Sequence, residues 1–346
     1  MDKPLHQTVS VCPTCYKQIR ANVIEENGAA MMVKRCAEHG EFRALVESDA
    51  DFYRGTLQLP NNEVYRHQVI DITHRCNVAC PNCYYPIKNK SDDRSIDSIL
   101  EELAVTSCQA VLSGGEPTLR DDLPEIISRI KRMGRPVSIL TNGIRFANEA
   151  FLDQCCEAGL LEGKQFHASI SLHTRDYLTP KLFAAKERAI KNIEERGGQI
   201  AELMFTLQTL DELPQVIKTM RKYWQGAAFF RVRSPFNAWA EHRATVKIFV
   251  SDLFKAFAAR AKEDNVEFRI LPDFDNNVYH CTVVFDDLPT RLICCPDKGN
   301  IDVSQLHHRG PFHRSNNGEL TNLLHSFVIN EGMAEGWLNG KRIDGF

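Results

Sequence analysis

Three cysteines in the pattern Cys-x3-Cys-x2-Cys have the clearest chemical potential in this sequence. Cys76, Cys80 and Cys83 directly follow a strand-like segment, VIDIT. Three closely spaced thiolates in a loop at the carboxyl end of a strand can hold three corners of a [4Fe–4S] cluster, which leaves the fourth iron open to another ligand. A zinc site would need a fourth protein ligand nearby, for which His74 is a candidate. The spacing favours the cluster, with zinc as the alternative.

Short apolar segments alternate with amphipathic ones around these cysteines, between residues 66 and 240. The expected strands are 67–73, 109–115, 136–142, 165–172, 203–210 and 227–234, and the expected helices are 95–105, 122–133, 148–158, 182–196 and 213–224. Strands that are apolar on both faces and separated by helices are typical of a parallel sheet. The pattern therefore predicts an α/β fold, a partial (β/α)6 barrel of the TIM type that is open and not closed into eight strands.

Residues 1–55 have the pattern of a small metal-binding module. Cys12 and Cys15 form one close pair, and Cys36 and His39 form a second pair after a short β-like segment. So short a region cannot build a stable core unaided, and paired ligands of this kind are typical of a metal-stabilised fold. Cys36 and His39 could also be separated in space.

Residues 241–346 predict a C-terminal α+β extension that covers the site. Its expected elements are a helix over 246–263, paired strands over 278–285 and 290–295, and a helix near 320–331. Cys281, Cys294 and Cys295 fall on the paired strands. They could be packed core thiols, ligands of an auxiliary iron–sulfur cluster, or a site for a soft substrate such as trivalent arsenic. Neighbouring strand residues point to opposite faces, which disfavours one site for Cys294 and Cys295 together.

The cysteine loop and the segment Ser113-Gly114-Gly115-Glu116-Pro117 together resemble the radical S-adenosylmethionine (SAM) superfamily, which has a GGE motif after its second strand. The resemblance implies that Gly114, Gly115 and Glu116 bind the ammonium group of SAM, because paired glycines permit close approach of the backbone and a carboxylate neutralises an amine.

The resemblance also implies that polar residues at the ends of later strands contact SAM. These residues are Asn142, Ser169, Ser171, Gln208, Arg231 and Arg233. Arg231 and Arg233 alternate on one strand, so both could face the site and bind a carboxylate, or they could belong to a solvated edge. The family often has an aromatic residue before the third cluster cysteine, where this chain has Asn82. That departure leaves open the adenine pocket and the direction of SAM cleavage.

The N-terminal region is similar to a module that precedes the radical SAM domain in a pterin methyltransferase-like lineage that includes tetraether synthase. In that lineage cysteines hold a rubredoxin-like metal. The likeness implies that Cys12, Cys15 and Cys36 bind zinc or a mononuclear iron. His39 as the fourth ligand favours zinc.

These resemblances imply a transferase-type enzyme that reductively cleaves SAM at a [4Fe–4S] cluster and alkylates, methylates or couples a small-molecule substrate. An electron donor such as flavodoxin or ferredoxin would be its partner. One alternative is transfer of the 3-amino-3-carboxypropyl group of SAM to trivalent arsenic, as in the arsenite-alkylating radical SAM enzyme of the arsinothricin pathway. A second alternative is a non-catalytic zinc scaffold.

The composition narrows the classes of partner and compartment. A net charge of -3 with 25% charged residues gives no global basic field for nucleic acid. The sequence shows no apolar run typical of a signal peptide or a membrane span, so we expect a cytoplasmic protein. Twelve cysteines in such a protein favour metal ligation over disulfides.

Overall fold

The structure, a computed structural model, describes residues 4–12, 14–15, 17–57, 67–80, 93–163, 167–173, 178–207, 209–223, 227–233, 248–263, 268–273, 278–285, 288–294, 337–338 and 341–342. Among the helices in these ranges, none has the length and apolar character needed to cross a membrane.

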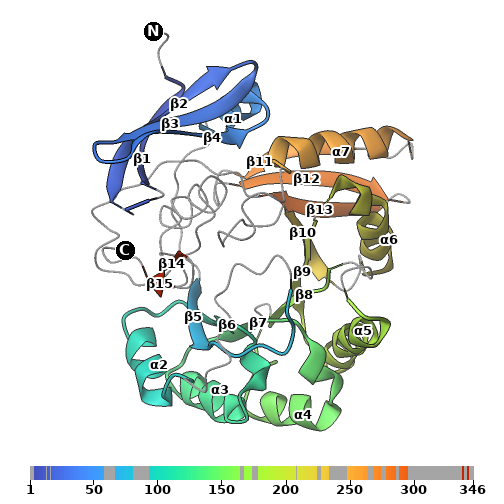
Figure 1. The fold of residues 1–346 in the computed structure, drawn as a ribbon. Coiled ribbons are helices and arrows are strands. Elements are labelled where there is room, and N and C mark those ends of the chain that lie inside the picture. Colours follow the sequence, from blue (N-terminus) through green and yellow to red (C-terminus); the bar gives the residue numbers. More distant parts are fainter. Residues whose placement is uncertain are drawn as a thin grey trace.

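The N-terminal residues form a four-stranded antiparallel sheet with one helix packed on it (Figure 1). The strands pair in chain order as β1 (His6–Val11), β2 (Gln18–Glu26), β3 (Ala29–Cys36) and β4 (Gly40–Glu47), and α1 (Ala50–Leu57) follows. Their shared core is small and consists of Ala21, Val23, Ala30, Met32 and Tyr53. The β-like segment of the sequence is β3. The other three strands were missed because each contributes few large apolar residues to so small a core.

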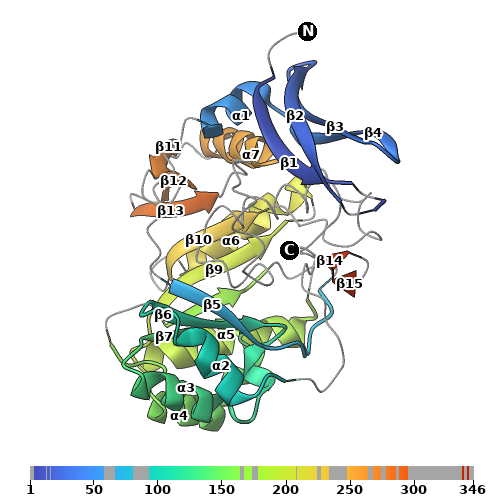
Figure 2. The same cartoon turned by 90° about the vertical axis from the view of Figure 1, so that its left-hand side faces the viewer.

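Six parallel strands form the centre of the molecule, and helices cover their outer face (Figures 1 and 2). The strands lie in the order β5 (His67–Thr73), β6 (Gln109–Gly114), β7 (Val137–Thr141), β8 (Ala168–Ser171), β9 (Ile200–Thr206) and β10 (Ala227–Arg233). The helices are α2 (Ile96–Leu103), α3 (Leu123–Arg132), α4 (Glu149–Glu157), α5 (Pro180–Glu195) and α6 (Leu213–Tyr223). The predicted partial barrel is confirmed. Strand β9 ends earlier than expected because Thr209 and Glu212 form a capping box that starts the next helical turn.

The C-terminal region continues this sheet. The helix α7 (Val250–Glu263) precedes β11 (Phe268–Asp273), β12 (Val278–Phe285) and β13 (Leu288–Cys294). Strand β13 pairs in parallel with β10, and β12 and β11 follow as antiparallel neighbours, which extends the sheet to nine strands. The expected antiparallel pair is therefore present, but it is joined to the barrel. The helix expected near 320–331 lies outside the described residues, and β14 (Trp337–Leu338) and β15 (Lys341–Arg342) form a separate small pair.

Buried polar contacts hold the N-terminal module against α7. The Glu47 carboxylate accepts hydrogen bonds from the hydroxyl of Ser251, at 2.6 Å, and from its backbone N–H, at 3.4 Å. Beside it, the Ser48 hydroxyl donates to Asp252 at 2.7 Å. Burial raises the pKa of Glu47, and the hydrogen bonds from Ser251 counter that shift. These contacts anchor the module to the C-terminal region.

Candidate functional site

Cys76 and Cys80 lie in the loop after β5, at the carboxyl edge of the parallel strands, and both pack against the central core. Burial raises the pKa of the Cys76 thiol to about 11, and burial also raises the pKa of Cys80. A buried thiol of this kind becomes a thiolate when a bound cation offsets its charge, so the two side chains fit iron ligation. Cys83 lies outside the described residues, and the three-cysteine ligand set stays a prediction.

Gly114 and Gly115 bring the end of β6 against the base of this loop. The N–H of Gly115 donates to the carbonyl oxygen of Thr73 at 2.9 Å, and the N–H of Glu116 donates to that of Arg75 at 2.7 Å. A Cβ added at Gly114 would lie 2.2 Å from the Thr73 oxygen, and one added at Gly115 would lie 2.3 Å from the Arg75 oxygen. We expected the glycines to admit a ligand. That role stays a prediction, and in the structure their missing side chains leave room for the backbone that leads into the cysteine loop.

The Glu116 side chain ties the ends of two strands together. It is 1% exposed, and its Oε1 accepts from the N–H and the hydroxyl of Thr118, at 3.0 and 2.6 Å, and from the Thr141 hydroxyl, at 2.7 Å. Its Oε2 accepts from the N–H of Asn142 at 2.6 Å. Four donors of the chain therefore share the carboxylate that the sequence assigned to the ammonium of SAM. That assignment stays a prediction, and the geometry gives the side chain a framework role.

Asn142, at the end of β7, connects this framework to the cysteine loop. Its Nδ2 donates to Asn77 Oδ1 at 2.8 Å, and its Oδ1 accepts from the N–H of Ile144 at 3.0 Å. Ser169 and Ser171 lie on the neighbouring strand β8, where Ser169 is buried and Ser171 is half-buried. The ends of β5 to β8 thus bring most of the expected SAM-binding positions to one edge of the sheet.

The structure gives less information on the other residues that the sequence assigned to SAM or to a C-terminal site. Arg231 and Arg233 lie on β10, two residues apart, in register with Met204 and Thr206 of β9. Gln208 lies outside the described residues, as does Cys295. Cys281 and Cys294 lie on β12 and β13, where their register partners are Leu292 and Tyr279. The roles of all these residues stay predictions.

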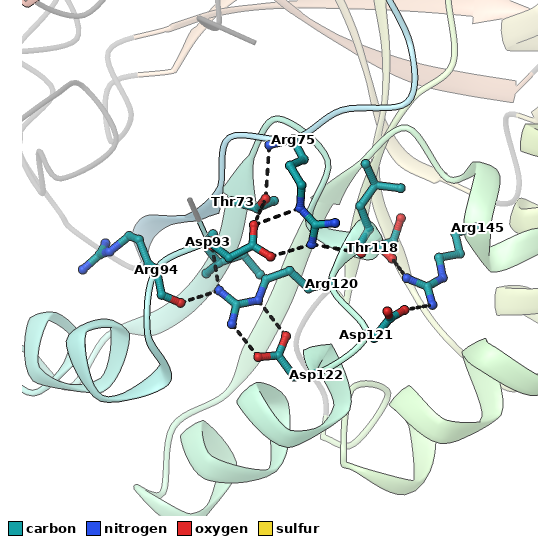
Figure 3. A network of polar contacts seen from close by, with 11 residues as sticks. Thr73, Arg75, Asp93, Arg94, Thr118, Arg120, Asp121, Asp122 and Arg145 are labelled. Carbon is teal, nitrogen blue, oxygen red and sulfur yellow. Dashed lines mark hydrogen bonds and ion pairs between the residues drawn. The ribbon is translucent and has the colours of Figure 1, made fainter. Parts of the chain in front are cut away.

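An ion pair closes the base of the cysteine loop, as Figure 3 shows. Arg75 directly precedes Cys76, and its guanidinium donates to both carboxylate oxygens of Asp93, at 3.1 and 2.5 Å. The same carboxylate accepts from the Thr73 hydroxyl at 2.5 Å. The pKa of Asp93 is lowered because these hydrogen bonds outweigh its partial burial, which acts in the opposite direction. Residues 75 and 93 are therefore fixed to each other on either side of the segment that carries the cysteines.

A second arginine, Arg120, lies next to this ion pair and attracts the Asp93 carboxylate. Arg120 is 3% exposed, and its guanidinium donates to the carbonyl oxygens of Ile72, at 2.8 Å, and Arg94, at 2.6 Å. It also donates to both carboxylate oxygens of Asp122, at 2.8 and 2.5 Å (Figure 3). Guanidinium groups bind carboxylates and carbonyls in such fixed directions because their donors are planar. These contacts hold strand β5, the backbone at Arg94 and the start of α3 together.

The pair Arg75–Asp93 should contribute measurably to stability despite its partial exposure. In a double-mutant cycle with Arg75→Met and Asp93→Asn, we expect a coupling free energy of about 1 kcal/mol, since the contact is bidentate and shared with Thr73. The pair Arg129–Asp97 has a single close contact and a side chain of Asp97 that is 80% exposed, so it serves as the control with less than about 0.5 kcal/mol. Urea denaturation measures both cycles. Equal coupling in the two pairs would contradict a special role for residues 75 and 93.

The N-terminal cysteines and His39 meet between the two turns of the small sheet. Cys12 and Cys15 lie in the β1–β2 turn, Cys36 ends β3 and His39 lies in the β3–β4 turn. All four ligand atoms are within 4.8 Å of one another. The His39 Nδ1 atom lies 3.6 Å from the Cys12 sulfur and 3.4 Å from the Cys36 sulfur, and the Cys15 and Cys36 sulfurs are 3.9 Å apart. Tetrahedral zinc would require edges of about 3.5 Å between nitrogen and sulfur and about 3.8 Å between sulfurs.

The electrostatics of this site also suit a metal. The hydrogen bond with His39 lowers the pKa of the Cys36 thiol to about 6, so this sulfur is available as a thiolate at neutral pH. The structure brings together the two pairs that the sequence could not place relative to each other. The four residues fit zinc by geometry and donor type, while the identity of the metal stays a prediction.

Metal removal should loosen the N-terminal sheet alone. The module has only a small apolar core, so chelation in the full chain should speed amide exchange across β1–β4 at least about tenfold and leave β5–β9 unchanged. His39→Ala should weaken zinc binding about tenfold or more, whereas His39→Cys should retain it. Hydrogen-exchange mass spectrometry with zinc titration checks both results. Unchanged protection after complete metal removal would contradict a structural metal.

Several groups around the cysteine loop were not expected from the sequence. In the sequence, only the nearness of Asp93 and Arg120 to the motifs distinguishes them from other charged residues. Lys186 had one, because it occupies the apolar stripe of α5 between Phe183 and Ile190, where a charged residue is unusual.

Two family models match the chain. The HMPTM N-terminal zinc ribbon domain matches residues 4–48, and the radical SAM superfamily matches residues 70–220. The first range contains the four clustered ligands, and the second contains the cysteine loop and the parallel strands.

Curated relatives match parts of the chain. The 7,8-dihydro-6-hydroxymethylpterin dimethyltransferase of Methanocaldococcus jannaschii is 31% identical over 239 residues, which are 58% of this chain and 47% of that protein. The PqqA peptide cyclase of Xanthomonas oryzae pv. oryzae is 39% identical over 98 residues, which are 27% of this chain and 26% of that protein. The chain thus matches about half of the first relative or less. Among solved structures, Streptococcus suis SuiB bound to its precursor peptide SuiA has a TM-score of 0.43 and 17% identity, over 62% of this chain and 50% of that one.

Proposed function

We propose that this chain is a radical SAM enzyme that reductively cleaves SAM at a [4Fe–4S] cluster held by Cys76, Cys80 and Cys83 and modifies a small acceptor with the resulting carbon radical. The matches of residues 70–220 to the radical SAM superfamily and of residues 4–48 to the zinc ribbon domain support this proposal. The observation that carries the proposal is the convergence of Cys76 and Cys80 with the Gly115–Glu116 backbone at the carboxyl ends of β5 and β6. Ligand and catalytic sites of βα-barrel folds lie at this edge.

The chain's own residues position and shelter the reaction. When bound, the cluster and SAM supply one-electron cleavage of a carbon–sulfur bond. Cys76 and Cys80 provide thiolates in a partly buried loop, Arg75 and Asp93 hold the ends of that loop, and Glu116 fixes the ends of β6 and β7 against it. Because these contacts leave the loop few alternative positions, they keep the reacting atoms aligned and limit the access of water.

A small acceptor that receives a one-carbon or alkyl group is the substrate class with the most support. The relative named as a pterin dimethyltransferase matches 58% of this chain, and the zinc ribbon family covers residues 4–48. The peptide cyclase matches only 27% of the chain. We propose flavodoxin or ferredoxin as the electron donor, and zinc in the site formed by Cys12, Cys15, Cys36 and His39.

Anaerobic reconstitution followed by product analysis tests the proposal. The full chain with iron, sulfide, dithionite and SAM should show a reducible cluster by electron paramagnetic resonance and should form 5′-deoxyadenosine. A Cys76/Cys80/Cys83→Ala triple variant should lose both signals. Cys156→Ala, which changes a partly buried cysteine on α4, should keep both and is the matched control. A brown wild-type protein whose cluster cannot be reduced would contradict the proposal.

Two other products would support the alternatives. Methylthioadenosine in place of 5′-deoxyadenosine would indicate transfer of the 3-amino-3-carboxypropyl group, for which trivalent arsenic is the acceptor to test. A colourless protein that binds zinc alone after iron reconstitution would indicate a scaffold, an alternative that the match of residues 70–220 to the radical SAM superfamily disfavours.

A further inference from the structure

Helix α5 buries a lysine on its apolar face. Lys186 is 0% exposed and lies on the same stripe as Phe183, Ala189 and Ile190. Lysine is almost never fully buried unless a nearby charge or polar group offsets the cost of removing the ammonium from water. Among the residues that the structure describes, the ammonium has one hydrogen-bond acceptor, the carbonyl oxygen of Ser171 at the end of β8. One neutral acceptor does not balance a buried positive charge.

The ammonium lies at the carboxyl end of β8, the same edge of the sheet at which the cysteine loop and Glu116 lie. Burial lowers the pKa of Lys186 to about 8, and the charges of Cys80, Glu116 and Cys76 oppose that shift in this order. The carboxylate of Glu116 already accepts four hydrogen bonds from Thr118, Thr141 and Asn142. The carboxylate remains negative, so it shares the positive charge of the ammonium with the two cysteines. Helix α5 holds the ammonium behind the strands.

We propose that Lys186 is a positioning residue for the electronic state of the cluster: its ammonium is the buried positive charge that makes one-electron reduction more favourable. The inference rests on the proposed function, which places the cluster on Cys76 and Cys80. A cluster held by three thiolates gains one negative charge when it is reduced, and a nearby cation in a medium of low dielectric constant stabilises the more negative state. Net charge and solvent exposure are among the factors that set the potentials of such clusters.

Redox titration of matched variants tests the proposal. Lys186→Met removes the charge at similar length, and Lys186→Arg keeps it. Lys191→Met changes a lysine of the same helix whose side chain is 72% exposed. In SAM-free, reconstituted protein, we expect the equilibrium constant for cluster reduction to fall at least tenfold in Lys186→Met, which is about 59 mV for a one-electron couple. Lys186→Arg and Lys191→Met should stay close to wild type. Electron paramagnetic resonance of the reduced cluster provides the readout.

The other outcomes of the titration overturn the proposal or contradict the proposed function. A Lys186→Met protein with a complete cluster and an unchanged midpoint potential overturns the proposal, and weaker SAM binding in that protein assigns the ammonium to the carboxylate of SAM instead. If Lys186→Met assembles no cluster, Lys186→Gln, which keeps a donor for the Ser171 oxygen, is titrated in its place. A wild-type chain without a reducible cluster contradicts the proposed function, so the two failures are distinguishable.

Discussion

Gly115→Ala should abolish cluster assembly and lower the free energy of unfolding by about 3 kcal/mol. The new Cβ would lie 2.3 Å from the carbonyl oxygen of Arg75 and 2.9 Å from that of His74. Both are backbone atoms, so relief requires that β6 or the first residues of the cysteine loop move. The hydrogen bond from the N–H of Glu116 to the same Arg75 oxygen would be strained as well. Because Cys76 is the next residue, the displacement would reach the iron ligands.

Gly134→Ala is the matched control for this substitution. Gly134 has φ +74° and open space where a Cβ would lie, so alanine there should cost only about 1 kcal/mol of backbone strain. Its cluster content should equal that of the wild type. Urea denaturation and iron and sulfide analysis after anaerobic reconstitution give the two measurements. A Gly115→Ala protein that binds a full cluster would show that the contact between β6 and the loop is not required.

The architecture could be predicted from local patterns because the central strands are apolar on both faces. Residues 109–114 and 137–141 are buried on both sides of the sheet, and such runs between amphipathic helices have few alternative folds. The order of the C-terminal strands could not be predicted. Strand β13 follows β12 along the chain but pairs with β10 on its other edge, and packing across the whole molecule decides such a pairing.

The positions of the motifs could be predicted, but the partners of their side chains could not. The sequence identified Gly114, Gly115 and Glu116 and assigned all three to a ligand, a role that stays a prediction. The glycines contact carbonyl groups about forty residues earlier, and Glu116 binds Thr141 and Asn142, about twenty-five residues later. Parallel strands bring such distant residues together, and no local spacing encodes that contact. The N-terminal ligands were easier to predict because each pair lies at one hairpin turn, three residues apart.

Glu116→Gln should lower the free energy of unfolding by about 3 kcal/mol even without SAM. Three donors converge on Oε1 and the N–H of Asn142 points at Oε2, so an amide group must direct its NH2 toward one of these donors. The hydroxyls of Thr118 and Thr141 can rotate, but the backbone N–H of Thr118 at Oε1 and that of Asn142 at Oε2 cannot. The glutamine therefore leaves a buried donor facing another donor, and the end of β7 shifts relative to the loop.

The same variant separates the two roles open to this carboxylate. If Glu116 holds the frame, stability falls in the SAM-free protein, and SAM binding weakens about tenfold or more because Asn142 and the loop move. If it binds the ammonium of SAM directly, affinity falls while the SAM-free protein keeps its stability. Glu125→Gln, at a carboxylate that is 57% exposed and paired with Arg129, is the control and should change stability by less than about 0.5 kcal/mol. Urea denaturation and isothermal titration with SAM distinguish the two cases. Because Glu116 accepts four buried hydrogen bonds, we expect the first result, a loss of stability in the SAM-free protein.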